Sequence, residues 1–387
     1  MNNTLYDVII IGAGPSGTSC AYNILRLKPD AKVLLIDKTN FPRYKPCGGG
    51  VSPEVANYLD FPLESAINYK CNQVVMVANG KEIESNQHEL WMVRREVFDN
   101  YLLEKAKSAG AEFIGNCEVK DIIHQNDGST LVTTEDQQFS GKIIVLAEGG
   151  RGKLAKRLGI APENTILAAM EYEHYSDQDL DGKLYIDFDY NDSGYAWNFP
   201  KNDGLSLGIG GLIKGKEKGK VNLPKKLSTY VAKFGVEQFN KTNLHGHPIE
   251  LYKKKHKLVH NNIVLIGEIA GCVDPLTAEG IRPAIKSGYL AAKRISQVIS
   301  SDKTKLLNQY TRDFHLNIGK DLRRARIMSF FLNRYMHQVL PMLTTKNAIN
   351  GFMDVFSGKS SYIEKINFRR IVKLCLRSLK PSNQLTK

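Results

Sequence analysis

A strand, a glycine-rich turn and a helix open the chain, and this unit most restricts the folds available to it. Residues 6–11 (YDVIII) form an apolar, β-branched run of the kind that is buried in a parallel sheet. The run leads into residues 12–17 (GAGPSG), a helical stretch to Leu27, and a second apolar strand, residues 32–36, that ends at Asp37. This order predicts a βαβ unit of the dinucleotide-binding type within an α/β fold.

The residues of the turn have distinct expected roles toward a dinucleotide. Gly12 permits the tight turn, Gly14 lets the backbone approach a pyrophosphate, and Gly17 allows close packing of the helix. The helix N-terminus offers unpaired N–H groups to the anion, and the Asp37 carboxylate can accept hydrogen bonds from ribose hydroxyls. The cofactor contacts predicted for this unit are Gly12, Gly14, Pro15, Ser16, Gly17, Asp37 and Lys38. The unit alone does not separate FAD from NAD.

Two later segments favour a flavin dinucleotide. Residues 142–147 form another apolar strand followed by Glu148 and glycines, and residues 262–266 lead into GEIAG (267–271) and then EGI (279–281). Glycines at a helix start can hold a ribityl chain and a pyrophosphate, and backbone N–H groups can face a flavin ring. Three separate segments that fit one flavin predict FAD as the cofactor. The contacts predicted here are Glu148, Gly267, Glu268, Gly271, Gly280 and Ile281.

Two arginines precede an amphipathic helix that has Phe98 and Leu102 on its apolar face. We expect Arg94 to be a solvated residue at the molecular surface. Arg95 is the better candidate for contact with the cofactor.

Residues 46–50 (PCGGG) hold a cysteine between a proline and three glycines, soon after the first unit. Such a backbone can approach a flat ligand closely, so the thiol of Cys47 is expected next to the dinucleotide.

The pattern of apolar and polar side chains changes between residues 160 and 255. Residues 183–190 and 205–210 alternate apolar and polar side chains with period two, which predicts an antiparallel sheet with one buried face. We expect this sheet to cover the flavin. Aromatic residues gather in residues 194–201 (GYAWNFPK), where ordinary core packing is an equal interpretation for Trp197.

These segments predict an α/β, doubly wound FAD-binding Rossmann-type domain with an inserted antiparallel-sheet substrate domain and a helical C-terminal region. The FAD-binding domain is discontinuous and takes residues 1–60, 90–155 and 255–300. Residues 61–89 and 156–254 form the substrate or cap domain, and residues 301–387 the helical, basic region.

The formal charge of +13 suits an anionic partner. Residues 323–335 and 368–377 interleave basic and apolar side chains, and such a stretch can lie on an anionic membrane. A helix packed on the body with a solvated charged face is the alternative. No nucleic-acid fold signature accompanies the charge, so we expect no binding of DNA or RNA.

Apolar runs and cysteine spacing bear on the location of the protein and on metal binding. No run of 18 apolar residues and no signal-peptide pattern occur, so we expect a cytoplasmic protein with peripheral contact at the inner face of the membrane. The six cysteines are scattered and form no CxxC pair, so neither a metal site nor a disulfide framework is indicated.

The PCGGG, YAWNFPK and GEIAG segments together resemble the geranylgeranyl reductase family of FAD-dependent oxidoreductases, which is related to the FAD hydroxylases and monooxygenases. The resemblance covers residues 5–300. It implies that Cys47, Gly48 and Gly49 lie near the flavin ring. It also implies that the substrate cavity is lined by Tyr195, Trp197, Phe199 and Pro200. Family members have Asp where this chain has Glu148 and Glu268.

The resemblance implies saturation of carbon–carbon double bonds in a polyprenyl (geranylgeranyl-type) lipid or quinone, by hydride transfer from N5 of reduced FAD. A dry apolar tunnel is expected to position the alkene. The catalytic candidates are Cys47, Tyr195 and Trp197, and the proton comes from Cys47 or an ordered water. Electrons come from NADPH or a reduced ferredoxin, since the chain has no second GxGxxG segment.

Two other functions stay open. An FAD-dependent monooxygenase, hydroxylase or halogenase that acts on a hydrophobic or aromatic small molecule shares these fingerprints, and a halogenase GWxWxIP segment resembles residues 194–200. The PCGGG run, and the lack of the lysine segment that halogenases place after the first unit, favour the reductase. A non-catalytic flavin or lipid carrier is the third interpretation.

Overall fold

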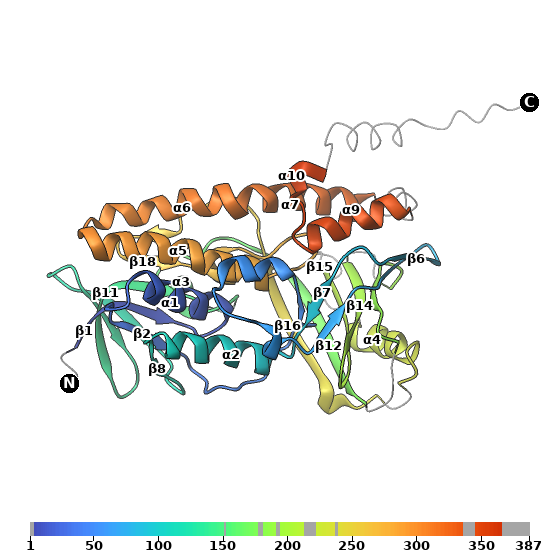
Figure 1. Ribbon diagram of the computed structural model, residues 1–387, viewed down its shortest axis with the longest axis horizontal. Helices are drawn as coiled ribbons and strands as arrows, with labels where there is room; N and C mark the ends of the chain where they lie inside the picture. The colour runs from blue at the N-terminus through green and yellow to red at the C-terminus, as the bar shows by residue number, and fades with distance from the viewer. Residues whose placement is uncertain are drawn as a thin grey trace, which may run out of the picture.

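An eight-stranded sheet contains the strand that opens the chain (Figure 1). The computed structural model describes residues 4–150, 152–176, 181–190, 194–212, 222–236, 239–335 and 345–365. Five parallel strands follow the order β18-β11-β1-β2-β8. The strands of this sheet are β1 (Leu5–Ile11), β2 (Val33–Ile36), β8 (Glu112–Ile114), β9 (Asp121–His124), β10 (Thr130–Thr133), β11 (Gln138–Leu146), β17 (Val259–His260) and β18 (Ile263–Leu265).

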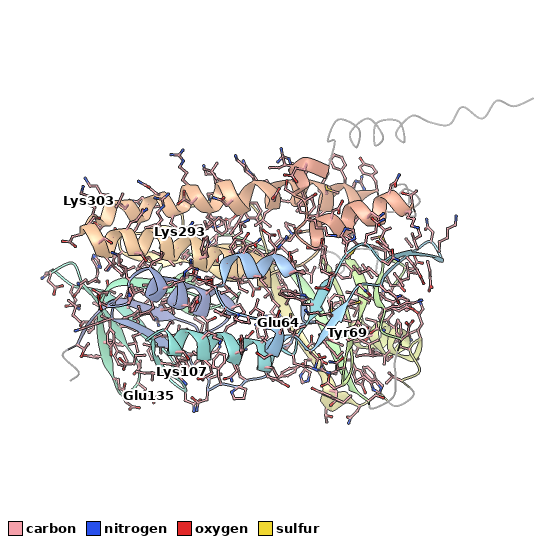
Figure 2. The ribbon with its side chains drawn as sticks, viewed as in Figure 1. Glu64, Tyr69, Lys107, Glu135, Lys293 and Lys303 are labelled. Atoms are coloured by element: carbon pink, nitrogen blue, oxygen red, sulfur yellow. The ribbon has the colours of Figure 1, made fainter. Side chains whose placement is uncertain are left out.

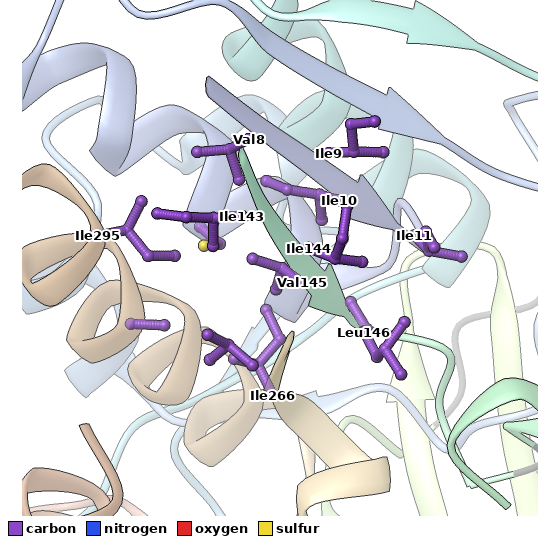
Figure 3. Packing of buried hydrophobic residues seen from close by; sticks show 14 of the residues in the cluster. Val8, Ile9, Ile10, Ile11, Ile143, Ile144, Val145, Leu146, Ile266 and Ile295 are labelled. Carbon is purple, nitrogen blue, oxygen red and sulfur yellow. The ribbon is translucent and has the colours of Figure 1, made fainter. Parts of the chain in front are cut away.

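Helices α1 (Pro15–Leu27), α2 (Arg95–Ser108) and α5 (Ile281–Ser301) pack beside one another, with α1 in contact with both of the others. Figure 2 labels Lys107 near the end of α2 and Lys293 in α5. The side chains of Val8, Ile9 and Ile10 are fully buried. Figure 3 shows residues 8–11 and 143–146 meeting in one cluster, which Ile295 of α5 joins. This burial explains why these strands read as continuous apolar runs.

A second, seven-stranded sheet has the order β16-β12-β15-β14-β13-β5-β6. All its pairs are antiparallel except β13 with β5. The strands are β5 (Val74–Ala78), β6 (Lys81–Ser85), β12 (Thr165–Tyr175), β13 (Leu184–Asp187), β14 (Gly194–Lys201), β15 (Gly204–Leu212) and β16 (Leu244–Leu251). A small sheet of β3 (Gly50–Val51), β7 (Leu90–Met92) and β4 (Tyr69–Cys71) packs against β14.

The expectation that the second sheet buries only one face is wrong for β15. Eight of its nine residues are buried. Helix α4 (Leu223–Ala232) covers the apolar face that was expected to be buried, and the indole of Trp197 lies over Gly208 on the face that the pattern assigned to solvent. Leu205, Leu207 and Ile209 pack against Leu227 and Tyr230 of α4. The polar residues between them are glycines and a serine, which fit a strand that is buried on both sides.

The C-terminal helices are α6 (Asn308–Phe314), the π-helical turn η7 (His315–Gly319), α7 (Lys320–Arg334), α9 (Lys346–Phe356) and α10 (Tyr362–Lys365). Helix α6 packs along the outside of α5, α9 packs against β6, and α10 contacts α7 and α9 (Figure 1). Among the described residues, the shorter helical segments are α3 (Lys153–Arg157), η1 (Pro53–Tyr58), η2 (Glu64–Ala66), η4 (Lys241–Asn243), η5 (Gly267–Ala270) and η6 (Thr304–Leu307). The basic stretch expected at residues 368–377 lies outside the described residues. No helix within the described ranges is long and apolar enough to cross a membrane.

The predicted fold class is confirmed. A largely parallel α/β sheet carries the glycine-rich turn, a mainly antiparallel sheet is inserted into it, and helices close the chain.

Candidate cofactor and substrate site

The glycine-rich turn lies between the end of β1 and the start of α1. Gly12 has φ +109°, and a Cβ at this position would overlap the carbonyl oxygen of Ala147. A Cβ on Gly17 would likewise overlap the carbonyl oxygen of Gly12. Gly14 caps α1, and no described side chain bonds to the N–H groups of the first turn. The turn therefore presents an open helix N-terminus of the kind that binds phosphate.

Asp37 ties the end of β2 to this turn. Its Oδ2 accepts a hydrogen bond from the Ala13 N–H at 2.8 Å, and its Oδ1 accepts from the N–H and hydroxyl of Thr39 at 2.9 and 2.8 Å. The carboxylate thus fixes the shape of the turn, and its contact with a ribose stays a prediction. Lys38 beside it is exposed.

The late glycine segment meets the first turn directly. Gly267 has φ +70°, and a Cβ there would overlap the hydroxyl oxygen of Ser16. The Gly267 N–H donates to Oγ of Ser287 on α5 at 2.9 Å. Gly280 caps α5, and within the described chain no side chain caps this helix start. Two open helix N-termini are therefore brought together by segments that lie far apart in the sequence.

The two glutamates at the expected Asp positions are used within the protein. Oxygen atoms of Glu148 accept hydrogen bonds from the N–H groups of residues 153–155, each at 3.1 Å, so its longer side chain caps α3. Glu268 accepts from the Glu250 N–H at 2.9 Å through one oxygen. We therefore leave Glu148 out of the proposed cofactor contacts and keep Glu268, whose second oxygen faces Gly149.

The expectation of a solvated Arg94 is wrong. Only 7 % of Arg94 is exposed. Its guanidinium pairs with Glu173 of β12 and with Asp203 at 3.0 Å, and it lies 4.5 Å from the ring centroid of Tyr175. Two carboxylates of the second sheet compensate the buried charge, which sequence periodicity along the helix could not reveal.

Arg95 and Arg43 share one buried carboxylate, Asp99. Arg95 donates to both Asp99 oxygens, at 2.8 and 2.7 Å, and Nη2 of Arg43 lies 3.1 Å from Oδ2. Two guanidinium groups on one carboxylate leave a net positive charge. Nη1 of Arg43 is buried and has no hydrogen-bond partner among the described residues. Its Nη2 would lie 3.7 Å from a Cβ on Gly14, so the positive charge borders the phosphate-binding turn.

The PCGGG loop packs against the aromatic strand β14. A Cβ on Gly48 would lie 2.8 Å from Nε1 of Trp197 and 2.9 Å from Cδ2 of Phe199. A Cβ on Gly50 would lie 2.9 Å from Cε2 of Phe199. The segment therefore needs glycines because aromatic side chains occupy the adjacent space. Nε1 of Trp197 is buried without a hydrogen-bond partner in the described part of the chain.

Lys201 fastens this loop to the second sheet. Its Nζ donates to the carbonyl oxygens of Gly48 at 2.9 Å and Val93 at 3.0 Å. Burial lowers the pKa of Lys201 to about 8, against the opposing charge of Glu173. Tyr195 is held at the other end of β14, where its hydroxyl donates to the carbonyl oxygen of Thr277. Pro200 is buried between Phe199 and Lys201.

Two further contacts that the sequence did not predict join the residues just before this loop to the second sheet. Nζ of Lys45 lies 2.7 Å from Nε2 of His247 on β16. Burial, with the charge of Arg95, lowers the pKa of Lys45 to about 8. The Tyr44 hydroxyl donates to Glu171 of β12 at 2.5 Å. The sequence did offer one signal for Glu171 and Glu173. They stand two residues apart in a strand, so their side chains lie on the same face of the sheet.

These features together fit FAD. The starts of α1 and α5, which no described side chain caps, and the glycine cradle offer backbone N–H groups. Arg43 and Trp197, whose donors lack a partner among the described residues, offer a cation and an aromatic wall. Such groups suit a pyrophosphate at one end and a flat ring at the other. The structure brings together the first turn, the PCGGG loop, the late glycines and β14, and their common role in holding a cofactor stays a prediction.

Comparisons with known proteins agree with this description. The family model described as lycopene cyclase protein matches residues 7–201. An uncharacterized protein of Methanosarcina barkeri is 32 % identical over 345 residues, which cover 87 % of this chain and 85 % of the relative. A digeranylgeranylglycerophospholipid reductase of Methanococcus vannielii is 24 % identical over 396 residues, with 99 % and 97 % coverage.

Two solved structures share the fold over nearly the whole chain. A geranylgeranyl bacteriochlorophyll reductase-like protein from Thermoplasma acidophilum has a TM-score of 0.76 at 20 % identity, and the match covers 97 % of this chain and 96 % of the other. The flavin-dependent brominase Bmp2 has a TM-score of 0.75 at 20 % identity, with 97 % and 100 % coverage.

Proposed function

From the premise that this chain belongs to the lycopene cyclase protein family and is an FAD-dependent oxidoreductase of the geranylgeranyl reductase group, we propose that it saturates carbon–carbon double bonds of a polyprenyl lipid or quinone. Bound FAD supplies, once reduced, the hydride at its N5 atom. The contacts proposed for FAD are the two glycine segments, Asp37, Arg43, Arg95 and the start of α5.

One observation carries the proposal, namely the direct packing of Trp197 and Phe199 on the glycines of the PCGGG loop. Residues 42–50, which include the PCGGG segment expected beside the flavin ring, are called the ring-side loop below. An aromatic wall beside this loop suits an apolar chain better than a polar substrate. Trp197 and Phe199 exclude water from the reacting carbons, and Tyr195, fixed by its bond to Thr277, limits how the chain can lie. Lys201 holds the loop through two backbone carbonyls, so the distance between loop and wall is fixed.

An anaerobic reoxidation experiment tests this function. The holoenzyme is reduced with dithionite, freed of excess reductant, and mixed with a geranylgeranylated lipid, with its saturated phytanyl counterpart, or with oxygen. Flavin reoxidation by the unsaturated lipid alone, with product gaining two hydrogens per bond in mass spectrometry, is the expected result. Equal, slow reoxidation by both lipids would contradict a reductase.

A halogenase or monooxygenase is the second candidate, and Lys45 is the observation that favours it. This buried amine has a pKa lowered to about 8 and lies on the ring-side loop. A neutral amine can capture an oxidised halide. Fast oxygen consumption with halogenation of an aromatic probe, abolished by Lys45→Met, would support this candidate over the reductase.

We also propose NADPH or a reduced ferredoxin as the electron donor, and the basic surface is compatible with either. Anaerobic reduction of the holoenzyme by each donor separates them, because only the physiological donor is expected to reduce the flavin within the turnover time.

A peripheral lipid contact through α7 completes the proposal. Leu316, just before α7, and Ile327 and Phe330 within it are 44 %, 40 % and 63 % exposed. The exposed basic residues Lys320, Arg323 and Arg334 alternate with these apolar residues at helical spacing, so they lie on the same face. Apolar side chains set among basic ones suit the surface of an anionic membrane. A polyprenyl substrate resides in such a membrane, so this contact would bring the protein to it.

A further inference from the structure

The second sheet turns a buried carboxyl toward the ring-side loop. Glu171 of β12 pairs in register with Gly208 of β15, which pairs in turn with Trp197 of β14. Residues directly opposite one another share a face of a sheet. A Cβ on Gly208 would overlap the indole of Trp197, so the ring lies across this glycine toward β12. Glu171 and the aromatic wall therefore belong to one surface, with only a glycine between them.

The loop itself holds this carboxyl. Glu171 is 3 % exposed. It accepts a hydrogen bond from the Tyr44 hydroxyl at 2.5 Å and another from the backbone N–H of Cys47. The ring of Tyr44 lies 4.4 Å, between centroids, from the imidazole of His245, which is the register partner of Glu171 on β16. The carboxyl is thus fixed next to the residue expected beside the flavin ring.

The surroundings of Glu171 favour its protonated form near neutral pH. Burial, followed by the charge of Glu173, raises the pKa of Glu171 to about 7. The other titratable groups that face it are Tyr44 on the loop, Lys201 on β14 and His245 on β16. The hydrogen bonds from Tyr44 and Cys47 and the charge of Lys201 oppose this rise, and each of these effects is smaller than the effect of Glu173. A carboxylic acid with such a pKa is suited to give up a proton at physiological pH.

We propose that Glu171 is the proton donor of the alkene reduction and that Tyr44 positions it. This inference rests on the proposed function. The π bond of the alkene breaks, one carbon gains the hydride supplied by reduced FAD, and the other gains the proton as the O–H bond of Glu171 breaks. The substrate would thereby gain two electrons, the reduced flavin would return to FAD by giving up that hydride, and the Glu171 carboxylate regains its proton from solvent. Cys47 then packs beside the ring without supplying the proton.

The first test measures single-turnover reoxidation of the reduced holoenzyme by a geranylgeranylated lipid across pH 5.5–9. The rate of the wild type is expected to fall as pH rises through about 7, because the donor loses its proton. Glu171→Gln is expected to react about 100-fold more slowly with no such pH dependence, and Glu171→Asp to recover part of the rate with the pH dependence restored. Tyr44→Phe should lower the rate and move its midpoint.

Two matched variants separate Glu171 from its neighbours. Glu173→Gln changes the acid two residues along the same strand and face, and Cys47→Ala removes the competing donor. Cys47→Ala is expected to keep the pH dependence of the wild type. Glu173→Gln is expected to keep a pH-dependent rate with a lower midpoint, because the charge of Glu173 no longer raises the pKa of Glu171. If the pH dependence is lost in Cys47→Ala and kept in Glu171→Gln, the thiol is the donor and the proposal is overturned.

Thermal unfolding gives a readout that does not depend on activity. The unfolded chain has an ordinary glutamate pKa of about 4.3, and the folded pKa is higher. The stability contributed by protonated Glu171 is therefore fully present below the unfolded pKa and is lost as pH rises through about 7. The Tm of the wild type minus that of Glu171→Gln should decrease between pH 5 and pH 8. A constant difference would mean that Glu171 is ionised throughout, and would overturn the proposal.

The outcomes also distinguish this proposal from the proposed function. If no alkene reoxidises the reduced wild type, the proposed reductase function is contradicted, and the proposed proton transfer from Glu171 is contradicted with it. If the alkene reoxidises the wild type, and Glu171→Gln reacts at the same rate with the same pH dependence, only the role of Glu171 is overturned. If Glu171→Gln does not bind FAD, the pH profiles of Glu171→Asp and Tyr44→Phe decide, and midpoints identical to that of the wild type in both count against the proposal.

Discussion

Gly48 lies where the ring-side loop and the aromatic strand come closest. A Cβ there would lie 2.8 Å from Trp197 and 2.9 Å from Phe199, which is closer than real Cβ contacts allow. Gly48→Ala is therefore expected to push the loop and β14 apart. Overpacking of this kind costs about 1–3 kcal/mol of stability. We expect a lower Tm and at least tenfold slower flavin reoxidation by the alkene.

Gly246→Ala is the matched control, because its Cβ would meet only atoms at 3.9 Å within the described chain. It should leave the Tm near that of the wild type. Equal behaviour of the two variants would mean that the loop is not confined by the aromatic residues.

Arg43 has a buried guanidinium nitrogen without a hydrogen-bond partner in the described ranges. If the pyrophosphate of FAD is that partner, Arg43→Gln removes a charge-assisted hydrogen bond of about 1.5–3 kcal/mol. The affinity of the apoprotein for FAD should then fall at least tenfold in a fluorescence titration, while Asp99 stays paired with Arg95. Arg294→Gln breaks the pair between Arg294 of α5 and Asp313 of α6, and this variant should bind FAD as the wild type does.

Single residues differ in how far the sequence could predict them. Gly12 and Gly17 follow from local turn geometry, so their roles were readable along the chain. Arg94 was misassigned because its partners, Glu173 and Asp203, come from another sheet. Glu171 reaches the site through strand register, which depends on pairing between residues distant in the sequence.

Among the elements, α1 and α5 form the contact on which the cofactor turn depends. Gly288 of α5 lies against the backbone of α1, where a Cβ would overlap the carbonyl oxygen of Ser16 and lie 3.0 Å from the Cys20 nitrogen. Gly288→Ala should separate the helices, lower the Tm and weaken FAD binding, since Ser16 also contacts Gly267.

A second helical glycine provides the comparison. A Cβ on Gly351 of α9 would have no described atom within 4 Å. Gly351→Ala should be neutral or stabilise by about 0.5–1 kcal/mol through helix propensity. A Gly288→Ala protein as stable as Gly351→Ala would show that the two helices are not closely packed.

The elements were predicted best where the pattern is strong and local. The helix that ends at Leu27 and the apolar strands of the first sheet were found by periodicity. The covering of β15 by α4 and the parallel pairing of β13 with β5 were not, because both depend on tertiary contacts. The longer reach of Glu148 to the start of α3 was hidden for the same reason.

At the scale of the whole molecule, the exposed face of α7 predicts binding to anionic vesicles that weakens as salt rises. Replacing both Ile327 and Phe330 by Glu should lower vesicle binding at least tenfold in a sedimentation assay, because both side chains are exposed and apolar. Ile123→Glu changes an exposed apolar residue of β9 and serves as the control. If the α7 double variant and Ile123→Glu bind vesicles equally well, the membrane contact does not involve Ile327 and Phe330.

The pairing of distant segments also constrains the order in which a nascent chain can mature. The first turn leaves the ribosome long before Gly267, Ser287 and Gly288, which contact or support it and lie far later in the sequence. Until they emerge, the buried face of α1 lacks its cover from α5. Cofactor capture should therefore be a late event in biosynthesis, and flavin supply should govern how much protein escapes proteolysis.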